Sequence, residues 1–247
     1  MRLERVKFDQ REFDIRCEWG PRGLEEISPI SDVVIVVDVL SFSTAVDVAT
    51  ARGAVVFPYP LKDRSAAAYA DSVGAQLASP NRNSGFSLSP STLQTVPPAY
   101  RLVLPSPNGS ALCFAAHGPH VLTACLRNAS AVAAAAGRLG STFALIPAGE
   151  TWATGEIRPS LEDLVGAGSV IAQLPGRRSP EAALAAAAFE HFRPNLGAAL
   201  RQCGSGKELI ERGFAADVDL AAQFDVSDNA PFLLDGAFLG KTNSLPR

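Results

Sequence analysis

Short apolar segments alternate with alanine-rich or amphipathic stretches along most of the chain. Val33–Val37 is a continuous β-branched run, which is typical of a strand buried on both faces in a parallel sheet. Residues 45–51 then predict a helix, and residues 54–57 predict a second short strand that ends before Pro58. Together these segments predict a strand–helix–strand unit, the building block of parallel sheets.

The same alternation continues beyond this unit. Further strands are predicted at 101–104, 121–124 and 142–146, and helices at 63–73, 111–116, 129–139, 160–174, 181–192, 197–203 and 207–212. Residues 218–224 fit a strand and a helix equally well, and residues 76–98 predict a long loop. This order favours one domain over residues 1–247, with a three-layer α/β/α fold and a largely parallel or mixed central sheet. A subdivision at 175–180 stays open, because that segment has the Pro and Gly content of a linker.

Composition agrees with a folded domain. Apolar residues make up 47% of the chain and charged residues 19%, as in ordinary globular proteins. Alanine concentrates at 131–136 and 182–188, which predicts helices packed closely on a sheet; compositional bias is the alternative. The four cysteines form no CxxC pair and have no zinc-binding spacing, so we expect reduced, buried thiols.

Charge and hydropathy exclude several classes of partner. The net charge is −3 and no cluster of Lys and Arg stands out, so nucleic acid is not an expected partner. No apolar run reaches the roughly 18–20 residues that span a bilayer. Residues 1–10 lack the apolar core of a secretory signal. We therefore expect a cytoplasmic protein that contacts neither nucleic acid nor membranes.

The most informative polar segment follows the first buried strand. Asp38 ends that strand, and Ser41, Ser43 and Thr44 lie at the start of the following helix. A carboxylate there must be paired, hydrogen-bonded or metal-bound, and a helix N-terminus favours an anion. The segment could thus combine a metal ligand with an anion-binding site. Equally, Ser43 could be an ordinary N-cap and Asp38 could hold a loop.

Other strand ends carry polar residues that would meet Asp38 if their strands are neighbours. They are Ser106–Ser110, Arg127–Asn128 and Ala148–Glu150. The turn Asn108-Gly109-Ser110 leads into a helix and could supply a second anion contact, although Asn-Gly is also a common turn. Ser160 and Asp163 resemble a capping box, and Glu162-Asp163 in a first helical turn could serve the helix dipole alone.

In combination, these segments resemble the magnesium-dependent 2-phosphosulfolactate phosphatases. The matching pieces, in the family's order, are Val-Val-Asp-Val-Leu at 36–40, Gly-Phe-Ser-Leu-Ser-Pro at 85–90, Asn-Gly-Ser at 108–110, Asn-Ala-Ser-Ala-Val-Ala at 128–133, Ala-Gly at 148–149, Glu-Asp at 162–163 and Ala-Gly at 167–168. The resemblance covers about residues 30–175 and weakly extends to 219–231. It implies Mg²⁺-dependent hydrolysis of the phosphate ester of a small sulfonated hydroxy acid.

The resemblance also implies roles for individual residues. Asp38 would be the central carboxylate, either ligating Mg²⁺ or attacking phosphorus, with Glu162 and Asp163 completing the metal site. Ser41 and Arg82 would act with Asp38 in the catalytic set. The substrate's phosphate or sulfonate oxygens would be held by Ser43, Thr44, Asn108, Gly109, Ser110 and Asn128.

Three positions depart from the family pattern. Ser41 stands where the family usually has Arg, and a hydroxyl cannot replace a bidentate guanidinium. Residues 79–82 read Ser-Pro-Asn-Arg in place of a Gly-Glu-Arg segment, so only Arg82 is kept, and the Gly-Phe loop is shorter and lacks an Asn. The expected partner is therefore a small phosphorylated organic acid, sulfonated or carboxylated. The alternatives are a catalytically impaired homologue that binds a small anionic metabolite and a structural subunit assembled through its Ala-rich helices; a homodimer stays open.

Overall fold

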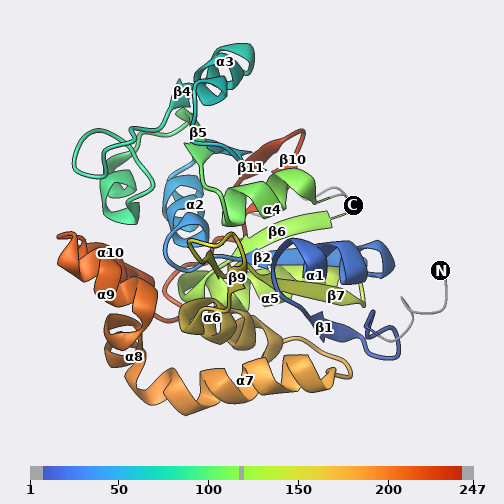
Figure 1. The fold of residues 1–247 in the computed structure, drawn as a ribbon. Helices are drawn as coiled ribbons and strands as arrows, with labels where there is room; N and C mark the ends of the chain where they lie inside the picture. The colour runs from blue at the N-terminus through green and yellow to red at the C-terminus, as the bar shows by residue number, and fades with distance from the viewer. Residues whose placement is uncertain (1–7, 117–119, 241–247) are drawn as a thin grey trace.

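The central sheet is built around the strand that the apolar run at 33–37 predicts. The computed structural model describes residues 8–116 and 120–240, and within them the main sheet has nine strands in the order β1-β7-β2-β6-β10-β11-β3-β5-β4 (Figure 1). β2 (Val33–Val37) pairs in parallel with β7 (Phe143–Pro147) on one side and β6 (His120–Ala124) on the other. All five of its residues are buried, as a strand covered on both faces requires.

A C-terminal hairpin joins two parallel groups of strands. β10 (Phe232–Leu234) is antiparallel to β6, and β11 (Ala237–Leu239) is antiparallel to β3 (Val55–Tyr59). Beyond β3 lie β5 (Arg101–Pro105) and β4 (Gln76–Leu77), both in parallel pairing. At the opposite edge, β1 (Ile15–Cys17) runs parallel to β7. The sheet is therefore mixed, and the predicted three-layer α/β fold is confirmed.

The hairpin was not among the predicted elements, although the sequence carries its signal. Asp235 and Gly236 connect the two strands, and both have positive φ angles, of 49° and 79°. An Asp-Gly pair with two positive φ angles is the favoured two-residue hairpin connection. Apolar residues flank the pair on each side, so Asp-Gly was the signal for a strand pair here.

Helices cover both faces of the sheet. Val33, Ile35 and Val37 of β2 pack against one set of helices, and Val34 and Val36 pack against the other. The first set comprises α5 (Ala129–Leu139), α6 (Leu161–Ile171) and α7 (Pro180–Phe192), and the second α1 (Gly20–Ile27), α2 (Phe42–Ala51) and α4 (Gly109–Ala115) (Figure 1). The alternation follows from the two-residue period of a strand.

The remaining elements lie around this three-layer body. They are α3 (Ser65–Ser72), the short 3₁₀ helices η2 (Ser28–Ile30), η3 (Pro90–Thr95), η4 (Leu126–Asn128) and η5 (Arg193–Asn195), the small hairpin β8 (Glu150–Thr151) and β9 (Ile157–Arg158), and the helices α8 (Leu196–Gln202), α9 (Gly204–Glu211) and α10 (Ala215–Ala221). Helix α10 includes residues 218–221 of the ambiguous segment 218–224, and residues 222–224 form neither a helix nor a strand. Among the residues described, no helix combines the length and apolarity that a membrane span needs.

The segment at 175–180 connects α6 to α7 and runs beside β1. The Ile15 amide donates to the Arg177 carbonyl at 3.0 Å, and the Ser179 amide donates to the Ile15 carbonyl at 2.9 Å. The alanines Ala182 and Ala185 of α7 are fully buried, as the composition of this stretch predicts. Small side chains let α6 and α7 approach so closely that a Cβ atom on Gly168 would lie 1.9 Å from the Ala185 carbonyl oxygen.

Two Gly→Ala substitutions should therefore act in opposite directions. Gly168→Ala inserts a methyl group where there is no space, so we expect it to lower the free energy of unfolding by about 1–3 kcal/mol or more. Gly137→Ala in α5 is the matched control, because nothing lies within 4 Å of its added Cβ. Gly137→Ala should raise the free energy of unfolding by about 0.5–1 kcal/mol. Urea denaturation measures both; equal effects would contradict the close packing of α6 on α7.

Candidate functional site

A cavity of about 210 Å³ lies where β2, β5 and β7 end. Its charged lining consists of three carboxylates, Asp38, Glu150 and Glu208, and three cations, Lys62, Arg82 and Arg212. Ser41, Ser106 and Asn108 also line it. Three of the four strand-end segments that the sequence singles out thus converge around a strongly charged space, whereas the fourth, Arg127–Asn128, does not line it.

Asp38 lies on the wall of this cavity and is held by two backbone amides. Phe42 N–H donates to its Oδ1 at 3.1 Å, and Gly109 N–H donates to its Oδ2 at 2.8 Å. The turn is fixed by Ser43, whose Oγ accepts from the Asp38 amide and whose amide donates to the Asp38 carbonyl. Burial raises the pKa of Asp38, the two amide hydrogen bonds oppose that rise, and the charge of Glu162 adds to it. Asp38 therefore holds the loop and also presents a carboxylate to the cavity.

The close approach of Gly109 explains the Asn-Gly turn. A Cβ atom there would lie 2.6 Å from the Phe42 ring and 2.7 Å from Asp38 Oδ2. Only glycine brings its amide this near to the carboxylate.

Asp163 connects two of the loops that surround the cavity. Its Oδ1 accepts from the Val39 amide at 2.8 Å, and its Oδ2 accepts from the Gly149 amide at 2.9 Å and from Ser160 Oγ at 2.8 Å. The capping box predicted for this helix is therefore wrong in detail. Ser160 donates to the carboxylate, and the carboxylate binds loops that follow β2 and β7. Burial raises the pKa of Asp163 well above its ordinary value, and the charges of Glu162 and Asp38 raise it further.

Glu162 is a buried carboxylate that lacks a hydrogen bond to one of its oxygens within the described residues. It is 2% exposed, and its Oε2 has no hydrogen-bond partner among the described residues. Its charge raises the pKa values of Asp38, Asp163 and Glu150. In residues 8–116 and 120–240, no three acidic, His or Cys side chains are grouped as a preformed metal site. Mg²⁺ typically uses one or two carboxylates together with water and substrate oxygens, so an unpartnered carboxylate oxygen whose charge acts on Asp38 fits that ion.

Glu150 belongs to the site but was not among the predicted site residues. Its Oε2 accepts from Asn108 Nδ2 at 2.9 Å. Burial raises the pKa of Glu150 to about 7, and the charges of Asp38 and Glu162 contribute to the rise. The segment 148–150 was noted as a strand end, but the meeting of Glu150 with Asn108 depends on the tertiary fold.

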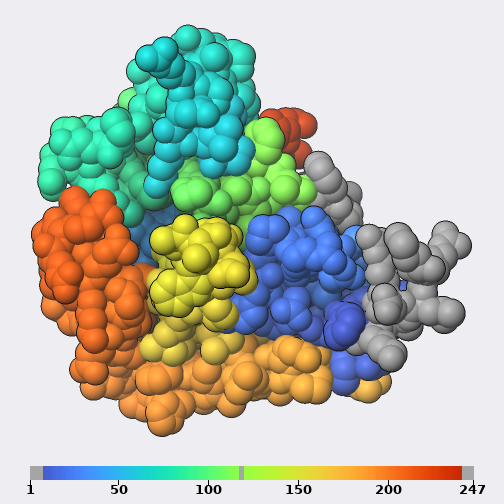
Figure 2. Space-filling model, viewed as in Figure 1, coloured from blue at the N-terminus to red at the C-terminus, as the bar shows by residue number. Residues whose placement is uncertain are grey.

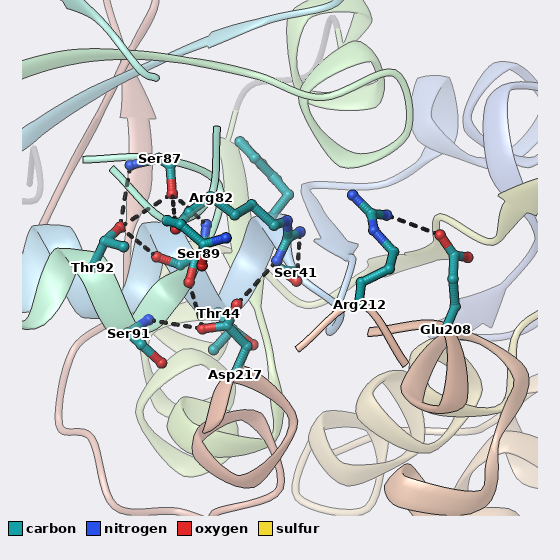
Figure 3. A network of polar contacts seen from close by, with 12 residues as sticks. Ser41, Thr44, Arg82, Ser87, Ser89, Ser91, Thr92, Glu208, Arg212 and Asp217 are labelled. Atoms are coloured by element: carbon teal, nitrogen blue, oxygen red, sulfur yellow. Dashed lines mark hydrogen bonds and ion pairs between the residues drawn. The ribbon is translucent and has the colours of Figure 1, made fainter. Parts of the chain in front are cut away.

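Arg82 brings a guanidinium group to the side of Ser41 (Figure 3). Its Nη2 donates to Ser41 Oγ at 3.1 Å, and its Nη1 donates to Asp217 Oδ2 at 3.1 Å. Asp217, from α10, is 1% exposed and also accepts from Ser89 Oγ at 2.7 Å and the Ser91 amide at 3.1 Å. A cation from a distant loop therefore stands beside the position where the family pattern has an arginine.

Four of the side chains expected at the substrate do not line the cavity. Ser43, Thr44, Ser110 and Asn128 are each fully buried. Their side chains bond, in that order, to Thr123 Oγ1, the Val39 carbonyl, the Leu104 carbonyl and the Cys125 amide, at 2.6–2.9 Å. These side chains fix the turns around the site. Asn128 caps η4 in this way, and its side chain does not cap α5 as expected.

A larger, mainly apolar cavity of about 820 Å³ adjoins the site. Pro107, Asn108 and Glu150 line both spaces. Figure 2 shows the surface of the elements that surround it: α1 in blue, α4 in green and the β8–β9 hairpin in yellow. The charged cavity and the apolar cavity thus share one wall.

Comparison with known proteins shows the family to which the chain is similar. The family model described as 2-phosphosulpholactate phosphatase matches residues 21–236. A probable 2-phosphosulfolactate phosphatase of Deinococcus radiodurans is 31% identical over 222 residues, which is 83% of this chain and 89% of the relative. A probable 2-phosphosulfolactate phosphatase of Gloeobacter violaceus is 34% identical over 119 residues, which is 47% of either chain. The chain therefore belongs to the 2-phosphosulpholactate phosphatase family.

Proposed function

We propose that this protein is a Mg²⁺-dependent phosphatase that hydrolyses the phosphate ester of a small sulfonated or carboxylated hydroxy acid, such as 2-phosphosulfolactate. The observation that supports this best is the cavity lined by Asp38, Ser41 and Arg82, where the charge of the buried Glu162, which does not itself line the cavity, acts on Asp38. Family membership supports the same chemistry.

Asp38 and Glu162 are the residues that would hold the cation. Each oxygen of Asp38 accepts one amide hydrogen bond and keeps a further lone pair, and Glu162 Oε2 is unpartnered within the described chain. Bound Mg²⁺ would neutralise charge on the phosphate oxygens. Asp163 uses both oxygens for loop contacts, so it positions the loops around Asp38.

Other side chains of the site would bind the phosphate and transfer the proton. Arg82 and the Ser41 hydroxyl bind phosphate oxygens, which compensates for the arginine absent at position 41. Glu150, with its pKa raised to about 7, can donate a proton to the departing alkoxide of the hydroxy acid. Asp38, oriented by Phe42 and Gly109, either attacks phosphorus, and water then hydrolyses the aspartyl phosphate, or serves as the cation ligand while water attacks phosphorus directly.

Asp38→Asn should abolish Mg²⁺-dependent phosphate release from 2-phosphosulfolactate, with kcat/KM lower by roughly 10³-fold or more. An amide can neither attack phosphorus nor bind the cation with full charge. Asp71→Asn on the exposed face of α3 is the matched control. Wild-type turnover by Asp38→Asn would reject this role. No release by the wild type, together with thermal stabilisation by phosphate, would favour the anion-binding alternative.

Glu150→Gln should stabilise the metal-free protein at pH 8 and not at pH 5. A carboxyl whose folded pKa is about 7 binds its proton more tightly in the native state than in the unfolded chain, so wild-type stability falls as pH rises from about 4.5 to 7. The glutamine keeps the Asn108 contact without the charge. We expect its free energy of unfolding to exceed the wild-type value by about 1–2 kcal/mol at pH 8, and Mg²⁺ should shrink that difference. A pH-independent difference would contradict the raised pKa.

Asp217→Asn should weaken phosphate binding by Arg82, although Asp217 itself does not contact the substrate. The loss of charge loosens the guanidinium, so we expect KM to rise by about tenfold with a smaller change in kcat. Asp219→Asn is the control, because Asp219 of the same helix pairs with Arg201 on the surface. A fall in stability with unchanged KM would assign Asp217 a purely structural role.

A further inference from the structure

A second cavity, of about 290 Å³, lies against the site cavity. The two share Lys62, Arg82, Leu88 and Arg212, so three cations stand in the wall between them. We call this second space the outer cavity. Apart from these residues it is lined by Asp63 and Ala66, the segments 77–80 and 104–105.

The two cavities differ in charge. The site cavity has the carboxylates Asp38, Glu150 and Glu208 to balance its three cations. The outer cavity has the same cations but only Asp63, which is exposed and already accepts from Ser65. An anion can therefore enter the outer cavity without a metal ion to offset acidic neighbours, whereas a phosphate in the site cavity faces three carboxylates.

Lys62 is the cation that lacks a partner. Arg82 pairs with Asp217 at 3.1 Å and Arg212 pairs with Glu208 at 2.9 Å (Figure 3), but Lys62 has no hydrogen bond or ion pair with any described residue. Burial lowers the pKa of Lys62, and the charges of Arg82 and Arg212 lower it further, against the opposing effect of Asp38 and Glu150. Although Lys62 as a whole is exposed, its ammonium group shares a cavity wall with two guanidinium groups, and a bound anion there would compensate that positive charge.

We propose that Lys62 and Arg212 bind a second acid group of the substrate, a carboxylate or a sulfonate, in the outer cavity while its phosphate occupies the site cavity. This inference rests on the proposed phosphatase function. It makes the protein selective for phosphate esters of hydroxy acids over esters of neutral alcohols. Arg82, which stands between the two spaces, contacts the phosphate side through Ser41.

The test compares three substrates. 2-Phosphosulfolactate carries a carboxylate and a sulfonate, 2-phospholactate carries a carboxylate alone, and isopropyl phosphate carries neither. For Lys62→Met and for Arg212→Met, the ratio of kcat/KM for an acidic ester to kcat/KM for isopropyl phosphate should fall about tenfold or more, as loss of a charged hydrogen bond implies. If this ratio falls only for 2-phosphosulfolactate, the bound group is the sulfonate. If it falls for 2-phosphosulfolactate and for 2-phospholactate, the bound group is the carboxylate.

Lys207→Met is the matched control, because Lys207 is exposed on α9 and lines neither cavity. For Lys207→Met, the ratio of kcat/KM for an acidic ester to kcat/KM for isopropyl phosphate should equal the wild-type ratio. Ratios within twofold of wild type for both Lys62→Met and Arg212→Met would overturn the proposal. Since Lys62 has no partner in the described chain, Lys62→Met should melt at or above the wild-type temperature, whereas a structural role requires it to melt lower.

A binding measurement separates this inference from the catalytic one. If the wild type releases no phosphate from any of the three esters, the phosphatase proposal fails, and 3-sulfolactate, which has no phosphate, then probes the outer cavity alone. Calorimetric titration should give a Kd about tenfold weaker for Lys62→Met than for the wild type. Equal affinities, or no binding to either protein, would overturn the subsite.

Discussion

The buried carboxylate of Asp38 is the constraint around which the site is arranged. Removing it from water is costly unless other groups compensate its charge, and the chain supplies two backbone amides for that purpose. One comes from its own loop, and the other comes from Gly109 after β5, where any side chain would collide with the carboxylate. Asp163 then joins the loops after β2 and β7 by the same kind of bond. Three strand ends are thereby held at one place.

The same bonds leave an excess of negative charge. The charges of Asp38 and Glu162 raise the pKa of Glu150, the charge of Glu162 raises that of Asp38, and Glu162 Oε2 has no hydrogen-bond partner in the described chain. Such an arrangement is unfavourable in the free protein, and both a cation and an added proton relieve it. We interpret the raised pKa of Glu150 and the unpartnered Glu162 as two consequences of one electrostatic imbalance, which the proposed binding of Mg²⁺ and substrate would correct.

Local patterns predicted the parts of this arrangement that depend on short stretches of chain. The β-branched run placed Asp38 at a buried strand end, and the alanine-rich stretches predicted closely packed helices. What local patterns did not predict depends on contacts between distant segments. Ser43, Thr44 and Ser110 read as anion-binding hydroxyls, but the turns around them use those hydroxyls internally. Glu150 and Lys62 carry no local signal, because their importance arises only when loops after different strands meet. The hairpin at 232–239 did have a local signal, the Asp-Gly pair, which went unused.

The measurement that tests the central claim most directly is calorimetric titration of Mg²⁺, in the presence of inorganic phosphate, into the wild-type protein and into Glu162→Gln. The glutamine preserves the shape of the side chain and removes the charge that leaves the site unbalanced. The account predicts Mg²⁺ binding to the wild type and an affinity at least about tenfold weaker for Glu162→Gln, as loss of a charged ligand implies. Equal Mg²⁺ affinities of the two proteins, or no Mg²⁺ binding by the wild type with phosphate present, would contradict it.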